Sequence, residues 1–142
     1  MMVHNQNPKE PILEIEDLTM AYRQGKEWQE AARHISMTLP LGQTYGLVGE
    51  SGSGKTTLAL AVMRYLPEEG SVCKGQIRFD GRDLLALDQE EMRSVWGAQM
   101  AMVPQEAQSS LNPSIPLGEQ AAEILHRHLG MNGKKARARV LE

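Results

Sequence analysis

The chain has 142 residues, of which 41% are apolar and 23% charged, and its formal net charge is −3. This length and composition are those of one ordinary globular domain and exclude an intrinsically disordered chain. The acidic balance gives no overall attraction to nucleic acid or to anionic lipid. The one cysteine, Cys73, cannot form an internal disulfide, which fits a reducing cytoplasmic setting, and no segment has the apolar length that spans a bilayer.

The N-terminal part of the sequence predicts two strands. Residues 1–11 are polar, and we expect a flexible lead-in. Apolar and polar residues alternate over Ile12–Leu18, which predicts a half-buried strand that Thr19–Tyr22 extends. The polar segment Arg23–Glu30 predicts a hairpin-like connection, and the alternation in Arg33–Leu39 predicts a second strand.

A glycine-rich segment follows between two apolar segments. The short apolar run Thr44–Val48 predicts a buried strand, and Thr57–Leu66 predicts a helix. Between them, Gly49–Thr56 reads Gly-Glu-Ser-Gly-Ser-Gly-Lys-Thr and fits G-x-x-x-x-G-K-[ST], the phosphate-binding loop called Walker A. The strand–loop–helix order is the structural context that this motif needs.

The residue types of this loop suit the binding of a phosphate. Glycines permit unusual backbone angles and let backbone N–H groups approach the anion, while the following helix presents its positive dipole end. Lys55 adds a charge for the β- and γ-phosphates, and the Thr56 hydroxyl is placed to bind Mg²⁺. The expected phosphate-binding residues are Gly49, Glu50, Ser51, Gly52, Ser53, Gly54, Lys55, Thr56 and Thr57.

The next segments predict a strand, a short helix and another strand. Gly75–Gly81 reads as a short edge strand closed by an Asp-Gly turn, so we interpret Asp80 as a turn residue rather than a metal ligand. Asp88, with Glu91 three residues later, predicts the N-cap of a short helix. The apolar run Gln99–Val103 predicts a core strand.

The C-terminal part of the sequence is predicted to be helical after a polar loop at Glu106–Ile115. Leu117–Leu129 places apolar residues on one face at helical spacing, and another helical pattern, rich in arginine and lysine, begins at Lys134. His126 and His128 are two residues apart and point to different faces, so they do not suit a shared metal ion.

The order of these pieces resembles the nucleotide-binding subunit of ABC transporters, and within it the importers of oligopeptides, dipeptides and nickel. The resemblance rests on Gly46–Thr57 and on the downstream Gln105, Ser109–Pro113 and Gly118–Gln120. It implies that Tyr22 stacks on adenine, although a tyrosine at a strand end is also compatible with a structural role.

The resemblance further implies that Gln105 is the Q-loop glutamine, whose amide reaches Mg²⁺ and the attacking water. The sequence departs from the family pattern around it, because Pro104 precedes Gln105 and Glu106-Ala107 follow it in place of the usual phenylalanine and Asp-Pro. By resemblance, Lys55 and Gln105 are the catalytic residues, and Thr56 and Gln105 lie at the metal.

The implied function is an ATPase that uses ATP and Mg²⁺ to drive import of peptides or a related small solute. Two ATP-binding subunits would dock on transmembrane permease subunits at the inner face of the cell membrane, with an extracytoplasmic solute-binding protein acting indirectly. The family's Leu-Ser-Gly-Gly-Gln signature, Asp-Glu strand end and later switch histidine do not occur in these 142 residues. We therefore expect the N-terminal part of such an ATPase, which binds nucleotide but hydrolyses it poorly.

The expected fold class is an α/β P-loop NTPase (ABC ATPase) core with an N-terminal antiparallel β layer and the start of a helical subdomain, incomplete in these residues. The expected segments are the lead-in at 1–11, the core at 12–106 and the helical subdomain at 107–142. In this fold, Thr44–Val48 and Gln99–Val103 belong to one mixed sheet. The alternatives are a soluble P-loop kinase, a nucleic-acid ATPase, or an inactive truncated product.

Overall fold

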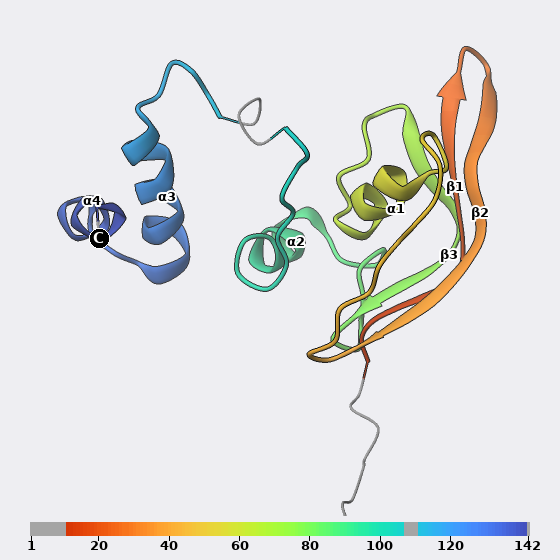
Figure 1. The fold of residues 1–142 in the computed structure, drawn as a ribbon, viewed down its shortest axis with the longest axis horizontal. Helices are drawn as coiled ribbons and strands as arrows, with labels where there is room; N and C mark the ends of the chain where they lie inside the picture. Colours follow the sequence, from red (N-terminus) through yellow and green to blue (C-terminus); the bar gives the residue numbers. More distant parts are fainter. Residues whose placement is uncertain (1–10, 107–110, 142) are drawn as a thin grey trace, which may run out of the picture. The chain divides into compact units, whose positions relative to one another are not determined.

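Two long antiparallel strands begin the described part of the chain, which comprises residues 11–106 and 111–141 of the computed structural model (Figure 1). They are β1 (Pro11–Gln24) and β2 (Glu27–Pro40), and they pair from end to end through a tight turn. Both predicted strands are confirmed and are longer than predicted, because the polar residues on either side of Gly25 also pair. The predicted flexible lead-in lies outside the described residues except for Pro11, which begins β1.

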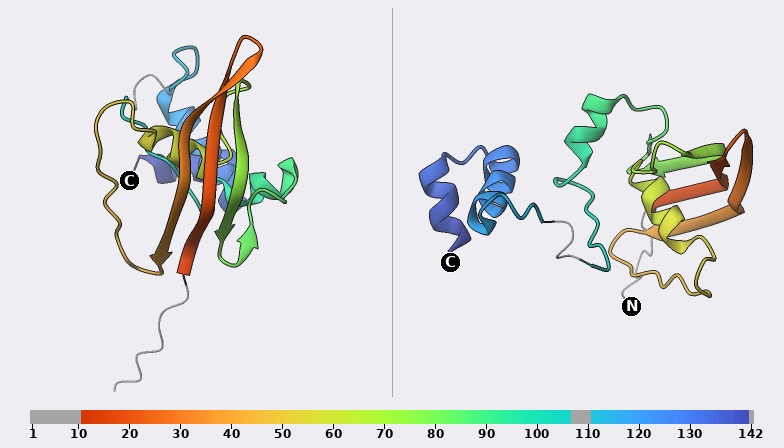
Figure 2. Two further views of the ribbon diagram at one scale, coloured as in Figure 1. Left: turned by 90° about the vertical axis from the view of Figure 1, so that its right-hand side faces the viewer. Right: turned by 90° about the horizontal axis from the view of Figure 1, so that it is seen from above.

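β1 and β2 belong to a four-stranded antiparallel sheet with the order β2-β1-β3-β4 (Figure 2). β3 (Gly70–Phe79) is longer than predicted and is not an edge strand, since it lies between β1 and the short β4 (Arg82–Asp83). Its first half, which precedes the predicted strand, pairs with the far end of β1. The Asp80-Gly81 turn is confirmed, with φ of 49° and 72°, the left-handed angles of a tight hairpin turn.

Helix α1 (Lys55–Val62) contacts β1, β2 and β3 and covers one face of the sheet (Figure 2). The core of this unit includes the fully or almost fully buried side chains of Ile15, Leu18, Met20, Leu58, Ala61, Ile77 and Leu84. α1 ends four residues earlier than predicted. Arg64 adopts a left-handed φ of 50°, and the Tyr65 N–H donates to Leu60 O at 2.8 Å, which closes the helix.

The two predicted core strands Thr44–Val48 and Gln99–Val103 are wrong, because neither segment forms a strand in the structure. Val48 is 93% exposed and Val103 is 87% exposed. A continuous apolar run is typical of a strand buried between neighbours in a parallel sheet. A strand also needs neighbours for its backbone hydrogen bonds, and within residues 11–106 and 111–141 neither run has a paired strand.

The residues from Glu90 to Glu142 form a second compact unit, described here by itself. The three predicted helices are confirmed as α2 (Gln89–Val95), α3 (Leu117–Leu129) and α4 (Gly133–Val140). α3 and α4 contact each other and bury Ala122 and Ala136. Ser109 and Ser110 of the predicted loop lie outside the described residues. None of the helices in the described ranges is long and apolar enough to cross a membrane.

Candidate nucleotide site

The predicted phosphate-binding loop connects the exposed segment after β2 to α1, and its glycines take the angles that the motif requires. Gly52 and Gly54 have φ of 82° and 85°, a region that residues with a side chain adopt at a cost. Gly49 is needed for space instead, because a Cβ atom there would lie 2.7 Å from Ser53 Oγ. The loop is therefore shaped by its own backbone, with few side chains in the way.

The Lys55 side chain hydrogen-bonds to three atoms of this loop. Its ammonium donates to Gly49 O at 2.8 Å, to Glu50 O at 2.5 Å and to Ser53 Oγ at 3.1 Å. The positive charge thus stands within the curve of the loop, where an anion bound by the loop would meet it. The predicted association of the Lys55 side chain with the loop is present in the geometry, while its role toward phosphate remains a prediction.

The N-terminus of α1 points into the same place. Gly54 is the N-cap, no side chain hydrogen-bonds to this helix end, and its first turn carries no acidic residue. The first backbone N–H groups of a helix lack partners within the helix and carry its positive dipole. Thr56, whose side chain is exposed, and Thr57 lie in this first turn. An uncapped helix end beside a lysine is suited to bind an anion.

Tyr22 lies next to the loop, at the far end of β1. Its hydroxyl donates to Thr57 Oγ1 at 3.3 Å, and its ring packs so closely on Gly70 that a Cβ there would lie 2.9 Å from ring atom Cε1. Tyr22, Gly52, Gly54 and Thr57 line one cavity of about 310 Å³. The structure therefore brings the predicted base-side aromatic residue and the predicted phosphate loop together.

Four further residues line this cavity and were missed from the sequence: Gln24, Gln29, Glu30 and Ala31. They belong to the hairpin of β1 and β2, in which Tyr22 lies opposite Gln29. No motif marks them. The only available signal was the hairpin itself, since its register places the start of β2 beside Tyr22.

The remaining predicted residue, Gln105, lies in the second unit and has an exposed side chain. Its role stays a prediction. Within the described ranges, no three His, Cys, Asp or Glu side chains form a group that could hold a metal ion by themselves. A hydroxyl such as that of Thr56 binds Mg²⁺ together with substrate phosphates, which is the usual arrangement for this ion.

A left-handed glycine loop, an uncapped helix end and a lysine bound to the loop are the features expected of proteins with a phosphate-binding loop. Comparison with known families narrows this class. The family model described as ABC transporter matches residues 32–141, which is more than half of the chain. The chain therefore belongs to the ABC transporter family.

Curated relatives are similar over nearly the whole chain. It is 40% identical to the peptidoglycan transport ATP-binding protein YejF of Agrobacterium fabrum, covering 94% of this chain and 24% of that protein. It is 35% identical to the oligopeptide transport ATP-binding protein OppD of Bacillus subtilis, covering 92% of this chain and 37% of that protein. It is 38% identical to the glutathione import ATP-binding protein GsiA of Pectobacterium atrosepticum, covering 94% of this chain and 22% of that protein. The chain thus spans less than half the length of these relatives.

Solved structures confirm the fold. The dimeric post-hydrolysis structure of the ATP-binding cassette MJ0796 bound to ADP and Pi matches with a TM-score of 0.74 at 23% identity, covering 91% of this chain and 54% of that one. A second dimeric structure of MJ0796 has a TM-score of 0.77. The predicted fold class, an ABC ATPase core that is only partly present, is therefore confirmed.

Proposed function

We propose that this chain is the ATP-binding component of an ABC importer and couples ATP binding and hydrolysis to import of peptides or a related small solute. The observation that carries the proposal is the single cavity lined by Tyr22 and by the glycines of the loop that Lys55 fastens. This arrangement offers an aromatic face beside an anion-binding loop, which suits a nucleotide. The names of the relatives, which state transport of peptidoglycan or oligopeptides and import of glutathione, support the solute class.

In this proposal each residue of the site has a separate task. The loop N–H groups and the N-terminus of α1 bind the phosphates, and Lys55 leaves its contacts with the loop carbonyls in part to meet the β- and γ-phosphates. The Thr56 hydroxyl, in the first turn of α1, would hold Mg²⁺. When bound, Mg²⁺ neutralises charge on the transferred phosphoryl group. Tyr22 binds the base, and Gln105 orients the attacking water.

The reaction is phosphoryl transfer from ATP to water, which gives ADP and phosphate. The 142 residues contain neither the family's signature sequence nor its Asp-Glu strand end. We therefore propose that this chain alone binds nucleotide and hydrolyses it negligibly. Robust ATP turnover by the purified chain would contradict this part of the proposal.

The proposed assembly places two ATP-binding subunits, identical or different, on transmembrane permease subunits at the inner face of the cell membrane. An extracytoplasmic solute-binding protein would deliver the solute to the permease. Nucleic acid is not a proposed partner, because the net charge is −3 and only six residues are aromatic (Trp 2, Tyr 3, Phe 1). The helices in the described ranges lack the length and apolarity to cross the bilayer.

The experiment that tests the site is a titration of the chain with ATP and Mg²⁺, comparing the parent with Lys55→Ala. A charge-assisted contact contributes about 1.5–3 kcal/mol, so the variant should bind ATP roughly 10- to 150-fold more weakly. Lys134→Ala, which removes an exposed lysine of α4, is the matched control and should bind as the parent does. Equal affinity of the parent and Lys55→Ala would refute the assigned role.

A further inference from the structure

Three neighbouring strands share an irregularity at one line across the sheet. Asp17 in β1, His34 in β2 and Gly75 in β3 have left-handed φ of 46°, 53° and 98°, and β1 changes register there against both neighbours. A Cβ at Gly75 would lie 2.6 Å from the carbonyl oxygens of Glu16 and Asp17, so the backbones of β1 and β3 are in close contact. We call these three residues the bulge line.

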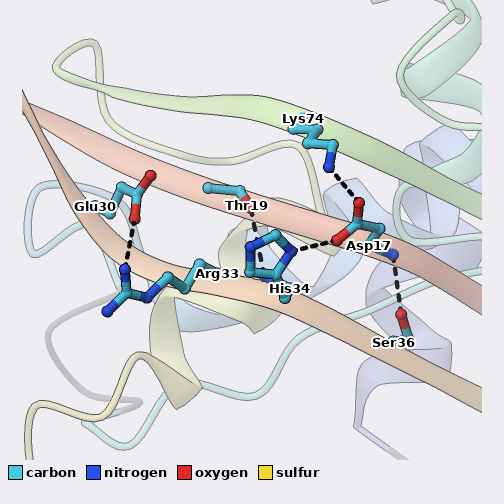
Figure 3. Close-up of polar contacts among 7 residues, drawn as sticks. All are labelled: Asp17, Thr19, Glu30, Arg33, His34, Ser36 and Lys74. Atoms are coloured by element: carbon cyan, nitrogen blue, oxygen red, sulfur yellow. Dashed lines mark hydrogen bonds and ion pairs between the residues drawn. The ribbon is translucent and has the colours of Figure 1, made fainter.

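Polar side chains tie the bulge line together on the face of the sheet that Figure 3 shows. Asp17 Oδ1 lies 2.6 Å from His34 Nδ1, and Asp17 Oδ2 lies 2.5 Å from Lys74 Nζ. The Asp17 N–H donates to Ser36 Oγ at 3.0 Å. The hydrogen bond from Lys74, and then that from His34, hold the pKa of Asp17 below its ordinary value. One carboxylate thus joins all three strands.

The bulge line changes which side chains face α1. Residues directly opposite each other in a sheet point to the same face, so the register defines rows of side chains on either side of the line. One row contains Ile15, Met37 and Ile77, and the other contains Met20, Ala32 and Val72. In each strand the members of the two rows are five residues apart, an odd spacing that would place them on opposite faces of a regular sheet.

Side chains of both rows nevertheless belong to the core. Ile15 and Ile77 of the first row are 2% and 0% exposed, Met20 of the second row is 0% exposed, and Met37, Ala32 and Val72 are half-buried. Because Leu18–Ala21 are all buried, the face of the second row is fixed by its contact with the phosphate loop. In the second row, Ala32 lies against Gly54 of the phosphate loop, since a Cβ on Gly54 would lie 3.1 Å from Ala32 Cβ. A bulge adds one residue to a strand and so inverts its alternation of faces. The bulge line makes this inversion in all three strands together.

The inversion decides the orientation of Tyr22, which lies two residues beyond Met20 and therefore shares its face. Without the extra residue, the alternation that starts at Ile15 would place Asp17, Thr19 and Ala21 on the face of Ile15. Tyr22 would then point away from α1 and Thr57. The nucleotide side of the sheet is thus built on a face that the bulge line creates.

We propose that Asp17 is a positioning residue for the nucleotide site: by joining His34 and Lys74 it holds the bulge line, which turns Tyr22 and Ala32 toward the phosphate loop. This inference rests on the proposed function, because it assigns Tyr22 to the base of the nucleotide. Asp17 itself lies on the opposite face of the sheet and acts through Tyr22.

The first test measures whether the Tyr22 ring lies against Gly70 in the absence of nucleotide. In NMR spectra of the parent chain, Tyr22 ring protons should give cross-peaks with the α-protons of Gly70. Asp17→Ala should lose them, whereas Asp17→Asn should keep them, because asparagine accepts a hydrogen bond and tolerates left-handed φ. Asp80→Ala is the matched control, since Asp80 is an exposed aspartate with a φ of 49° in the turn after β3.

The second test reads the site with two probes, ATP and inorganic tripolyphosphate, which lacks the base. Asp17→Ala should lower the affinity for ATP about tenfold, as expected for loss of one base-stacking contact, and change that for tripolyphosphate less than about twofold. In a Tyr22→Ala background, Asp17→Ala should have no further effect on ATP, because the two changes remove the same contact.

The two tests distinguish failure of the positioning role of Asp17 from failure of the proposed ATP-binding function. Three outcomes would overturn the positioning role. They are retained Tyr22–Gly70 cross-peaks in folded Asp17→Ala, an equal loss of affinity for ATP and for tripolyphosphate, and additive losses of ATP affinity when Asp17→Ala is combined with Tyr22→Ala. If Asp17→Ala does not fold, loss of the cross-peaks in Asp17→Asn would overturn it, and retention with a parent-like ratio of the two affinities would support it. Failure of the parent to bind ATP would refute the proposed function, and with it the nucleotide part of the inference, while the cross-peaks still decide whether Asp17 sets the face of Tyr22.

Discussion

Gly54 offers a direct test of how the phosphate loop is packed against the sheet. This residue has a φ of 85° and is the N-cap of α1. A Cβ there would lie 3.1 Å from Ala32 Cβ and 3.2 Å from Ala31 O. One of these neighbours is a backbone oxygen in β2, which cannot move away as the end of a long side chain can. Gly54→Ala should therefore combine backbone strain with crowding.

The two contributions can be estimated separately. Left-handed φ costs an alanine about 1–2 kcal/mol relative to glycine. Crowding of a packed position adds about 1–3 kcal/mol. We expect Gly54→Ala to lower the free energy of unfolding of this unit by roughly 2–5 kcal/mol. Gly52→Ala carries the strain without the crowding, because φ is 82° and no atom lies within 4 Å of the added Cβ, so about 1–2 kcal/mol is expected.

Urea denaturation followed by circular dichroism would measure both losses. Gly25→Ala, in the β1–β2 turn with a φ of 64° and no atom within 4 Å of its Cβ, is the control outside the loop and should match Gly52→Ala. ATP titration of the same proteins should show the largest loss of affinity in Gly54→Ala, because the loop must shift away from β2. If Gly54→Ala is no less stable than the two controls, the proposed contact between loop and sheet is refuted.

Three further predictions concern single side chains. Tyr22→Ala should weaken ATP binding roughly 5- to 150-fold through loss of base stacking, while Tyr22→Phe, which keeps the ring, should stay within about threefold in the same titration. Asn132→Ala should destabilise α4 by about 1 kcal/mol, because Asn132 Oδ1 caps this helix by accepting from Lys135 N at 3.0 Å, and thermal unfolding would measure it. Because Lys74 and His34 lower the pKa of Asp17 from its ordinary value of 3.8, the charged carboxylate stabilises the fold above that value and stops doing so as the pH falls through the lowered one. The stability of the parent relative to Asp17→Asn should therefore be constant near pH 5 and decline in more acidic solution, and an unchanged difference at low pH would contradict the ion pairs.

Local patterns predicted the elements whose signals are self-contained. Helix α3 begins at Leu117 and ends at Leu129 as predicted, because its apolar spacing is bounded by Pro116 and by Gly130 with a left-handed φ of 61°. The β1–β2 hairpin was predicted for a similar reason, since each strand alternates and the turn between them is polar. The phosphate loop was the clearest case, because its motif fixes both the glycine angles and the place of Lys55.

Predictions that depended on distant partners failed. Thr44–Val48 and Gln99–Val103 have the apolar composition of buried strands, yet Val48 and Val103 are exposed. Composition reports that a segment would be stable when buried, whereas forming a strand also requires neighbours that satisfy its backbone. Nothing in the two runs themselves states whether the described residues contain such neighbours.

The bulge line is intermediate between the locally predicted elements and the strands that depend on distant partners. Its irregularities are visible in the sequence of each strand, but the sequence does not show that they lie side by side in the sheet. Each strand contains a short run of residues that interrupts the alternation of apolar and polar positions. These runs are Glu16-Asp17, Arg33-His34 and Lys74–Gln76. Each run alone resembles an ordinary irregularity of a surface strand, and a fixed period of two still predicts the strand correctly while assigning its second half to the wrong face. Only the register, which aligns the three interruptions, shows that the sheet inverts as a whole and that Tyr22 faces the loop for this reason.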